Sequence, residues 1–311
     1  MPANYPEMWQ ARVERNINDA ANAPWLDGIP ELDTTVIEVG SGTATEANII
    51  HISNTDFSPD VLVNNTTYPL ALQAYTDSET TISLDKFSSL PTTITDDQAM
   101  GASYNRIDSA TNSHTEAILV KKFIKAAHAI APAANTAATP VILVTGVGTE
   151  ASGERLKASY EALVNLKAAC DSANPKMPAE GRRLILCDDH WNDLLLDRKN
   201  FGDQLVNYTE GKPAPRILGF EIFRYAQNPY FNSSTKTKLA FGASPSAGQY
   251  QASFVFVVKN IGKKTGKTKQ YYTPSELDAK NQVNTLAYRH YFLAVNMRVQ
   301  HCAAILSINK A

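Results

Sequence analysis

The stretch RRLILCDDHWNDLLLDRKNF (residues 182–201), followed after a polar gap by RILGFEIFRYAQNPYF (residues 216–231), decides the fold class. A short apolar strand at its start runs into acidic residues and then into a short helix. A second strand is expected to begin at Gly219 and to end in a turn at Asn228-Pro229. The pattern predicts an α+β fold, and nothing in this stretch is typical of a catalytic site.

The residues Asp188, Asp189 and His190 have the side chains of a metal site or of an acid–base pair. The sequence offers no obvious partner cluster, and the other histidines form no HxH or HxxxH pair. Asp188 or Asp189 as the N-cap of a helix over residues 191–197 is the more economical interpretation, because aspartate accepts hydrogen bonds from the first N–H groups of a helix. No catalytic residue and no metal ligand is therefore expected.

The composition is that of a folded chain with one large or two modest hydrophobic cores. The protein has 311 residues, of which 43% are hydrophobic and 19% are charged. It contains no run of ~20 apolar residues, so no membrane span is expected, and the first residues lack the apolar core of a signal peptide. The widely spaced Cys170, Cys187 and Cys302 predict reduced, mostly buried thiols in an intracellular protein.

The net charge of -2 hides an asymmetry between the two parts of the chain. Before Lys121 there are 17 acidic and 4 basic residues, and from Lys121 onward there are 14 acidic and 25 basic residues. Charge divided in this way favours contact between the two parts, either within one subunit or between neighbouring subunits.

The first third of the chain is predicted to be extended. Residues 1–33 are polar, with Trp9 and Trp25 as the large anchors, and are expected to form an arm that lies on a partner. Residues 34–91 are β-rich with turns between the strands, but they have few apolar residues for their length. They are expected to form a β excursion and not an independent globule. The expected strands are residues 34–39, 48–52, 69–75 and 80–84.

The remainder of the chain alternates between helices and strands. Residues 96–131 contain no proline and place apolar residues close to helical spacing, which predicts a long helix. An amphipathic helix is expected over residues 154–171, and a further helix over residues 273–280, behind Pro274. Further strands are expected at residues 140–144, 252–258, 288–295 and 302–308.

A glycine pattern after the strand at residues 140–144 satisfies a loose dinucleotide-binding fingerprint through Gly146 and Gly148. The acidic residue that binds the ribose should follow after ~20 residues, whereas the next strand ends only at Asp188. Glu150 and Glu154 also lie where the pyrophosphate anion of a dinucleotide would bind, and their negative charge disfavours it. A tight turn from strand to helix, with acidic residues in the first turn, is the structural alternative.

A second glycine pattern, VVKNIGKKTGKTKQ, resembles a phosphate-binding loop. That loop needs four residues between its glycines, whereas three separate Gly262 from Gly266. An exposed basic turn is expected instead, whose lysines could contact DNA phosphates nonspecifically or a neighbouring subunit. These candidate contact residues are Lys263, Lys264, Lys267 and Lys269.

The order of these segments resembles that of the major capsid proteins of tailed bacteriophages, which have the Hong Kong 97-type fold. The arm, the β excursion, the long helix, the module of residues 182–231 and the late strands QASFVFVVKN and RHYFLAVNMRVQHCAAILSI carry the resemblance. It implies an N-terminal arm (1–33), an extended β-loop (34–95), a peripheral domain with a spine helix (96–180), an axial domain (181–280) and a return to the peripheral domain (281–311).

The resemblance also implies a structural protein of the virion without enzymatic activity or cofactor. Copies would assemble in the host cytoplasm as pentamers and hexamers of an icosahedral or prolate shell around double-stranded DNA. Portal, scaffold and cementing proteins would be further partners. Neighbouring subunits are expected to meet through an electrostatic clasp. Asp77, Glu79 and Asp85 are the acidic residues of this clasp. The full set of candidate inter-subunit contact residues is Trp9, Trp25, Asp77, Glu79, Asp85 and Lys86. Lys86 is also a weak candidate for a covalent cross-link.

Three other functions remain open from the sequence. An encapsulin-like compartment would share the fold and would package a cargo enzyme instead of a genome. An oxidoreductase that binds NAD at the turn of Gly146 and Gly148 would be a small oligomer. A β-rich binding protein of the cell surface is disfavoured by the missing export signal.

Overall fold

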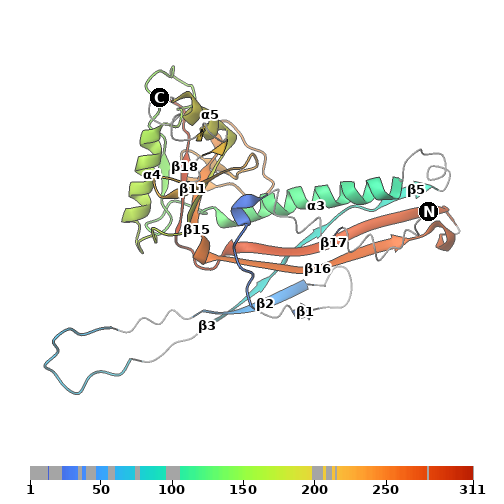
Figure 1. The fold of residues 1–311 in the computed structure, drawn as a ribbon, viewed down its shortest axis with the longest axis horizontal. Helices are drawn as coiled ribbons and strands as arrows, with labels where there is room; N and C mark the ends of the chain where they lie inside the picture. The colour runs from blue at the N-terminus through green and yellow to red at the C-terminus, as the bar shows by residue number, and fades with distance from the viewer. Residues whose placement is uncertain are drawn as a thin grey trace.

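The computed structural model describes residues 13, 23–33, 37–39, 47–54, 60–73, 78–95, 106–197, 206–207, 212–213, 216–278 and 280–310. These residues form a compact unit of helices and strands joined to an elongated unit, in which a long helix follows two long strands (Figure 1). A loop extends away from both units at the lower left of the view. None of the described helices is long and apolar enough to cross a membrane.

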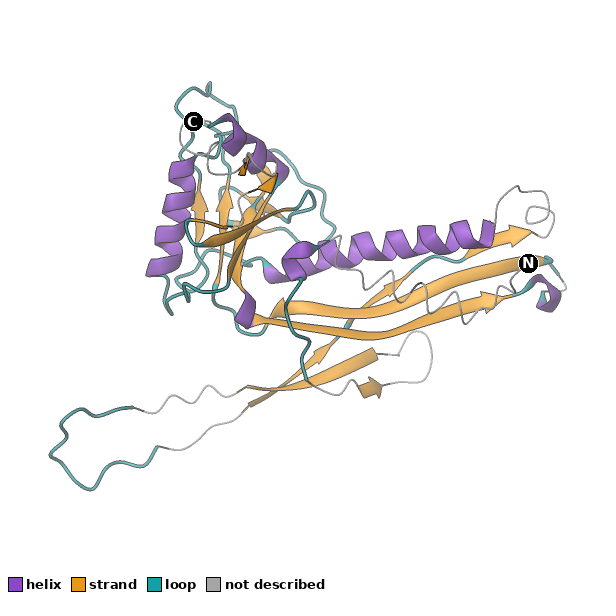
Figure 2. Ribbon diagram, viewed as in Figure 1, coloured by secondary structure: helices purple, strands orange, loops and turns teal. Residues whose placement is uncertain are grey.

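The compact unit is built on a six-stranded mixed sheet with the strand order β10-β11-β7-β15-β18-β6. The central strands β15 and β18 are buried along their whole length, which is typical of strands covered on both faces. Figure 2 shows the helices that flank these strands. The strands are β6 (Val141–Leu143), β7 (Arg182–Leu186), β10 (Arg216–Ile217), β11 (Phe220–Arg224), β15 (Ser253–Val257) and β18 (Cys302–Leu306).

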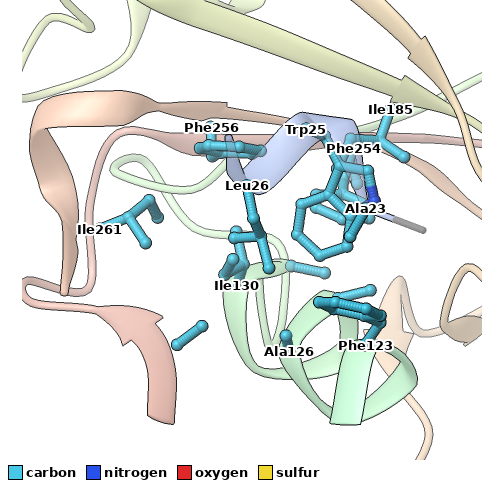
Figure 3. Close-up of a cluster of buried hydrophobic side chains, with 14 of the residues drawn as sticks. Ala23, Trp25, Leu26, Phe123, Ala126, Ile130, Ile185, Phe254, Phe256 and Ile261 are labelled. Atoms are coloured by element: carbon cyan, nitrogen blue, oxygen red, sulfur yellow. The ribbon is translucent and has the colours of Figure 1, made fainter. Parts of the chain in front are cut away.

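Hydrophobic side chains fill both faces of this sheet. On one face, α4 (Tyr160–Ser172) and α5 (Asp188–Leu196) contribute to the core through residues such as Leu166 and Leu194. On the other face, Trp25, Phe254 and Phe256 pack against the end of the long helix (Figure 3). The second core therefore joins the compact unit to the elongated unit.

The elongated unit is a long β ribbon with a helix on one face. The strands β16 (Ile261–Thr273) and β17 (Val283–Asn296) pair antiparallel, and the short strands β4 (Asp85–Ser88) and β5 (Thr92–Thr95) pair with the other edge of β17. The helix α3 (Arg106–Ile130) lies along this sheet (Figure 1). Helix and strands share two hydrophobic clusters and therefore support one another along their length.

Side chains alternate between the two faces of β17, as strand geometry requires. Leu286 and Phe292 pack on the side of α3, whereas Tyr291 packs with Ile50 and Leu84 on the opposite side. A β-bulge between Thr265 and Thr268 interrupts the register of β16.

The end of α3 is capped by side chains from later parts of the chain. Lys238 Nζ donates to the carbonyl oxygens of His128 and Ala131 at 2.5 and 2.7 Å, and Asn296 Nδ2 donates to that of Ile130 at 2.5 Å. The last carbonyl groups of a helix have no partner within the helix, so these bonds stabilise the junction between the two units.

A three-stranded antiparallel sheet carries the projecting loop. It has the order β1-β2-β3, with β1 (Ile37–Val39), β2 (Ala47–Asn54) and β3 (Ser78–Ser83). The loop containing residues 60–73 follows β2 and precedes β3 (Figure 1). The remaining elements are β8 (Val206–Asn207), β9 (Lys212–Pro213), β12 (Tyr230–Asn232), β13 (Thr237–Lys238), β14 (Gln249–Gln251) and the 3-10 turns Pro24–Leu26, Val258–Asn260 and Ser275–Leu277.

Most predicted elements are present, but several differ from the prediction. The amphipathic helix begins at Tyr160 and not at residue 154, because residues 154–156 run beside the C-terminal segment through hydrogen bonds such as Leu156 N to Ile308 O. The helix α5 begins at Asp188, with Cys187 in the N-cap position. The helix expected behind Pro274 is a single 3-10 turn, and the described residues 69–73 form no strand.

The structure groups some elements differently from the expected domain boundaries. β6 and α4, expected with the long helix, belong to the compact unit. β16, expected in the axial domain, pairs with β17 in the elongated unit, and β18 lies in the compact sheet. Strand partners far apart in the chain determine these groupings, and the order of elements along the sequence does not reveal them.

Candidate functional site

The arm contacts the elongated unit of its own subunit. Leu32 N donates to Lys263 O at 2.9 Å, and Lys264 Nζ donates to Leu32 O at 2.8 Å. Thr265 Oγ1 donates to Glu31 Oε1 at 2.5 Å. The acidic early part and the basic late part of the chain therefore meet within one subunit at this point.

Trp25 is a core residue and its side chain is fully buried. Its ring centroid lies 5.6 Å from that of Tyr225 and 6.4 Å from that of Phe256. Arg183 Nη1 donates to the carbonyl oxygens of Trp25 and Asp27 at 2.9 and 2.6 Å. This corrects the expectation of an inter-subunit contact, because the Trp25 side chain anchors the arm to its own subunit.

Of the other candidate contact residues, the structure describes the side chains of Asp85 and Lys86. Asp85 Oδ1 is 3.8 Å from Lys125 Nζ, and partial burial raises the pKa of the Asp85 carboxyl. Lys86 is exposed on β4. Glu79 belongs to β3, and its side chain is outside the described part of the structure, as are Trp9 and Asp77. Asp85 thus has an oppositely charged partner within its own subunit.

The basic segment is a long strand and not an exposed turn. Lys263 pairs with Ala294, on the side of α3, whereas Lys264 and Lys269 point to the opposite face. Lys267 is exposed at the bulge. The four lysines therefore do not form one continuous basic patch, although each of the two faces carries positive charge.

The turn that resembles a dinucleotide-binding loop already holds a carboxylate of its own chain. Glu150 Oε1 accepts hydrogen bonds from Val147 N at 2.9 Å and Lys157 N at 3.0 Å. These backbone bonds lower the pKa of Glu150 to about 2. Gly146 and Gly148 both have positive φ, and the helix that follows this turn begins only at Tyr160. The donors that would bind an anion are therefore engaged by Glu150.

The buried polar network around His190 is the feature that the sequence did not predict. His190 Nδ1 lies 2.8 Å from Ser253 Oγ, and His190 Nε2 lies 3.0 Å from Ser307 Oγ. Burial lowers the pKa of His190 to about 4. Next to it, Arg155 Nη1 and Nη2 bind Asp193 Oδ2 and Oδ1 at 2.7 and 2.9 Å.

This network joins α5, β15 and the C-terminal segment. No short sequence motif predicts it, because its members are up to 152 residues apart. Among the described residues, no group of three or more histidine, cysteine, aspartate or glutamate side chains could hold a metal ion. The histidine is neutral, satisfied and enclosed, so the arrangement is suited to holding the fold together.

The tip of the projecting loop is apolar and exposed. Residues 61–72 contain no charged residue. The tip is held in shape across its base, where Gln73 Nε2 donates to Asp60 Oδ2 at 2.7 Å and Asp60 N donates to Gln73 Oε1 at 3.0 Å. Its exposed apolar side chains are Val61, Leu62, Val63, Tyr68, Leu70 and Leu72. Exposed apolar surface of this kind is typical of a contact with another protein.

The comparisons with known proteins agree with this architecture. The sequence profile of the family described as phage capsid protein matches residues 76–298. No curated protein matches the chain. The chain therefore belongs to the phage capsid protein family.

Several solved capsid structures are similar to this chain. The capsid of cyanophage P-SCSP1u superposes with a TM-score of 0.54 at 16% identity, covering 92% of this chain and 91% of that one. The capsid of cyanophage Pam1 gives a TM-score of 0.55 at 12% identity over 83% and 84% of the two chains. A virus-like particle from Pyrococcus furiosus gives 0.53 at 10% identity over 98% and 100%.

These similarities confirm the expected Hong Kong 97-type fold. Together with the family, they identify a structural protein that forms the shell of a virion, and they do not favour the NAD-binding alternative.

Proposed function

We propose that many copies of this protein assemble, as pentamers and hexamers, into a closed icosahedral or prolate shell around phage double-stranded DNA. The observation that carries the proposal is the preformed, uncharged and exposed tip at residues 61–72. Apolar surface of this kind is costly in water and is covered in a stable assembly. In Figure 1 the loop extends away from the body of its own subunit, so a neighbouring subunit is the natural cover.

The two units of the subunit would form the two domains of such a shell protein. We assign the compact unit as the axial domain and the elongated unit, with α3 as its spine, as the peripheral domain. This assignment moves β6, α4 and β18 to the axial domain and β16 to the peripheral domain. The hydrophobic core around Trp25 contains residues of both units, so the two proposed domains are held together as one subunit.

The inter-subunit contacts are proposed to be more apolar than an electrostatic clasp. Asp85 already pairs with Lys125 in its own subunit. Trp9, Asp77 and Glu79 remain candidates from the sequence. A shell subunit needs several interfaces, each typically of ~1,600 Å² in total, so these charges would add specificity to a mainly apolar contact.

Further partners belong to the same proposal. The lysines of β16 offer nonspecific contacts to DNA phosphates, with Lys267 the most exposed of them. A portal, a scaffold and cementing proteins would complete the particle, which would assemble in the host cytoplasm. We also propose that the protein has no catalytic activity and requires no cofactor, in line with the enclosed His190 network.

An encapsulin-like compartment is the second candidate function. The match to the phage capsid protein family does not favour it, but such a compartment would share the fold, so the shell of a phage has to be distinguished from it. Both candidates predict closed particles, and only the shell of a phage predicts packaged DNA when the protein is isolated from virions.

Electron microscopy and analytical sedimentation of the purified protein test the shell. Closed particles of megadalton mass are the expected result. A stable dimer or tetramer under all assembly conditions, including the presence of the phage's other head proteins, would overturn the proposal. Nuclease-protected DNA in particles from infected cells then separates the phage shell from the compartment.

A further inference from the structure

The compact and elongated units meet at a narrow junction. β15 passes into β16 through the 3-10 turn Val258–Asn260, and β17 passes into β18 through residues 297–301. Asn260 Nδ2 donates to the carbonyl oxygens of Arg298 and Gln300 at 3.1 and 2.7 Å, so the two connections lie side by side. Hinges between units consist of a few residues at the ends of such elements. The two units would therefore rotate about this junction.

The arm crosses this junction through residues 23–33, here called the strap. On one side, the ring of Trp25 packs on that of Phe256, which lies in β15 just before the turn. On the other side, the backbone of Leu32 bonds to that of Lys263, near the start of β16. One continuous segment thus holds both sides of the hinge.

The strap is short and stiff. Leu32 follows Asp27 by five residues, so this part reaches at most ~17 Å even when fully extended. Its path turns at Gly28, which has a φ of +69° and whose N–H donates to Asp27 Oδ1 at 2.9 Å. Ile29 is buried in the core, and Pro30 has a fixed φ. A rotation that moved β16 away from the compact sheet would therefore break one of the two attachments.

Arg183 of β7 fastens the strap to the compact sheet. Its Nη1 donates to the carbonyl oxygens of Trp25 and Asp27 at 2.9 and 2.6 Å. Its Nε donates to Glu221 Oε2 at 2.9 Å, and its guanidinium carbon lies 5.5 Å from the ring centroid of Phe223. With a side chain only 13% exposed, Arg183 makes charge-assisted bonds, which are stronger than those between neutral groups.

We propose that the strap fixes the angle between the compact and elongated units, and that Arg183 is its positioning residue. Figure 3 shows Trp25 and Leu26 packed among Phe256 of the sheet and Ile130 of the helix, so the strap joins one core with both units. Release of the strap from Arg183 frees the hinge and lets the units take a range of angles. This device acts within a single subunit, before any contact between copies.

Double electron–electron resonance on unassembled subunits measures this angle as a distance. The spin labels are placed at Ala168→Cys on α4 and at Leu277→Cys in the turn between β16 and β17. Both positions are exposed, whereas the three native cysteines are buried. The unmodified background should give one narrow distance distribution. Arg183→Met removes the donors to the strap, so the distribution should become at least about twice as broad or shift its maximum.

Two further variants make the test specific. Arg224→Met is the matched control, because Arg224 lies on β11 of the same sheet and pairs with Asp188, away from the strap. It should leave the distribution unchanged. Lys264→Met combined with Thr265→Val removes two side-chain donors to the other end of the strap and should broaden the distribution as well. If Arg183→Met does not fold, this variant carries the test.

Three results would overturn the inference. The first is a broad distribution in the unmodified background, because the strap would then fix no angle. The second is an unchanged distribution in the strap variants that fold, because the core and the cap of α3 would then hold the angle alone. The third is an equal broadening in Arg224→Met and Arg183→Met. None of these results depends on the formation of particles, so the inference and the proposed function can fail separately.

Discussion

Asp193 holds Arg155 through both carboxylate oxygens, at 2.7 and 2.9 Å. Asp193 Oδ2 also accepts a hydrogen bond from Ala158 N at 3.0 Å, so one carboxylate fixes both the guanidinium group and the backbone just before α4. Its side chain is only 5% exposed. The pair therefore ties the segment that precedes α4 to α5.

Asp193→Ala should destabilise the subunit strongly, because it leaves the Arg155 guanidinium with an unpaired charge in a mostly buried place. We expect the free energy of unfolding to fall by about 3–5 kcal/mol, measured by urea denaturation of unassembled subunits. Lys167→Ala removes an exposed ion pair with Asp171 and should cost less than about 1 kcal/mol. Equal effects of the two substitutions would contradict the structural role of Asp193.

Gly266→Ala should also destabilise the subunit, because β16 approaches its neighbours closely there. An added Cβ would lie 2.7 Å from Tyr291 Cβ and 2.9 Å from Leu84 Cδ2. We expect a loss of about 1–3 kcal/mol from overpacking. At Gly262 the nearest atoms, at 3.1 Å, are the flexible Leu32 Cδ1 and Met297 Cγ, so Gly262→Ala should cost less. Thermal unfolding of both variants measures the two losses of stability. A larger loss for Gly262→Ala than for Gly266→Ala would contradict this packing.

The stability of the subunit should fall in acid through His190. Its pKa is lowered from 6.5 to about 4 in the folded state by burial and by Arg155, so protonation favours the unfolded state. The contribution of neutral His190 to the free energy of unfolding is complete above pH ~6.5. It is lost progressively as the pH falls toward 4, by ~1.4 kcal/mol per pH unit. Buried His290, whose pKa is lowered to about 3, adds to this loss.

His190→Gln isolates the contribution of His190. The variant should be less stable than the unmodified chain at pH 7.5, since it weakens the bonds to Ser253 and Ser307. Between pH 6.5 and 4 its stability should fall less steeply, with the remaining slope due to His290 and other groups. Parallel curves for the two proteins would show that His190 does not titrate as described.

Leu72→Asp should prevent assembly without unfolding the subunit. The Leu72 side chain is fully exposed, so its replacement costs the monomer nothing in packing, whereas an interface would have to bury an unpaired charge. We expect a loss of particles of at least about tenfold by sedimentation. Thr66→Asp adds the same charge at an exposed polar position of the loop and should have a smaller effect. An equal loss in both variants would favour a general effect of charge over apolar docking.

Much of the local structure could be predicted because local patterns encode it. Alternation of apolar residues placed β2 and β3, helical spacing placed α3, and the continuous apolar runs placed β7, β15 and β18. The start of α4 was missed because residues 154–156 bond to the C-terminal segment, a partner about 150 residues away. Likewise, the expected N-cap at Asp188 or Asp189 was one or two residues late, since Cys187 occupies that position.

The candidate contact residues were harder to predict, because a sequence does not tell which partners lie within the subunit. Trp25 is an isolated aromatic residue in a polar arm, and that pattern fits a core anchor and an interface equally well. The sequence predicts an exposed basic turn for the four lysines of β16, whereas strand alternation and the bulge distribute them over both faces of the sheet.

The sequence by itself determined the class of protein. The order of arm, β-loop, spine helix and later strands is a linear property, and the apolar, uncharged stretch at residues 61–72 can be read directly from the chain. The tertiary structure decided which residues of these segments are buried or paired inside the subunit and which are exposed. Trp25 is buried and Asp85 is paired, whereas the apolar side chains of the loop tip are exposed. The physical reason is that burial and ion pairing depend on distances between residues remote in the chain, which only the folded structure sets.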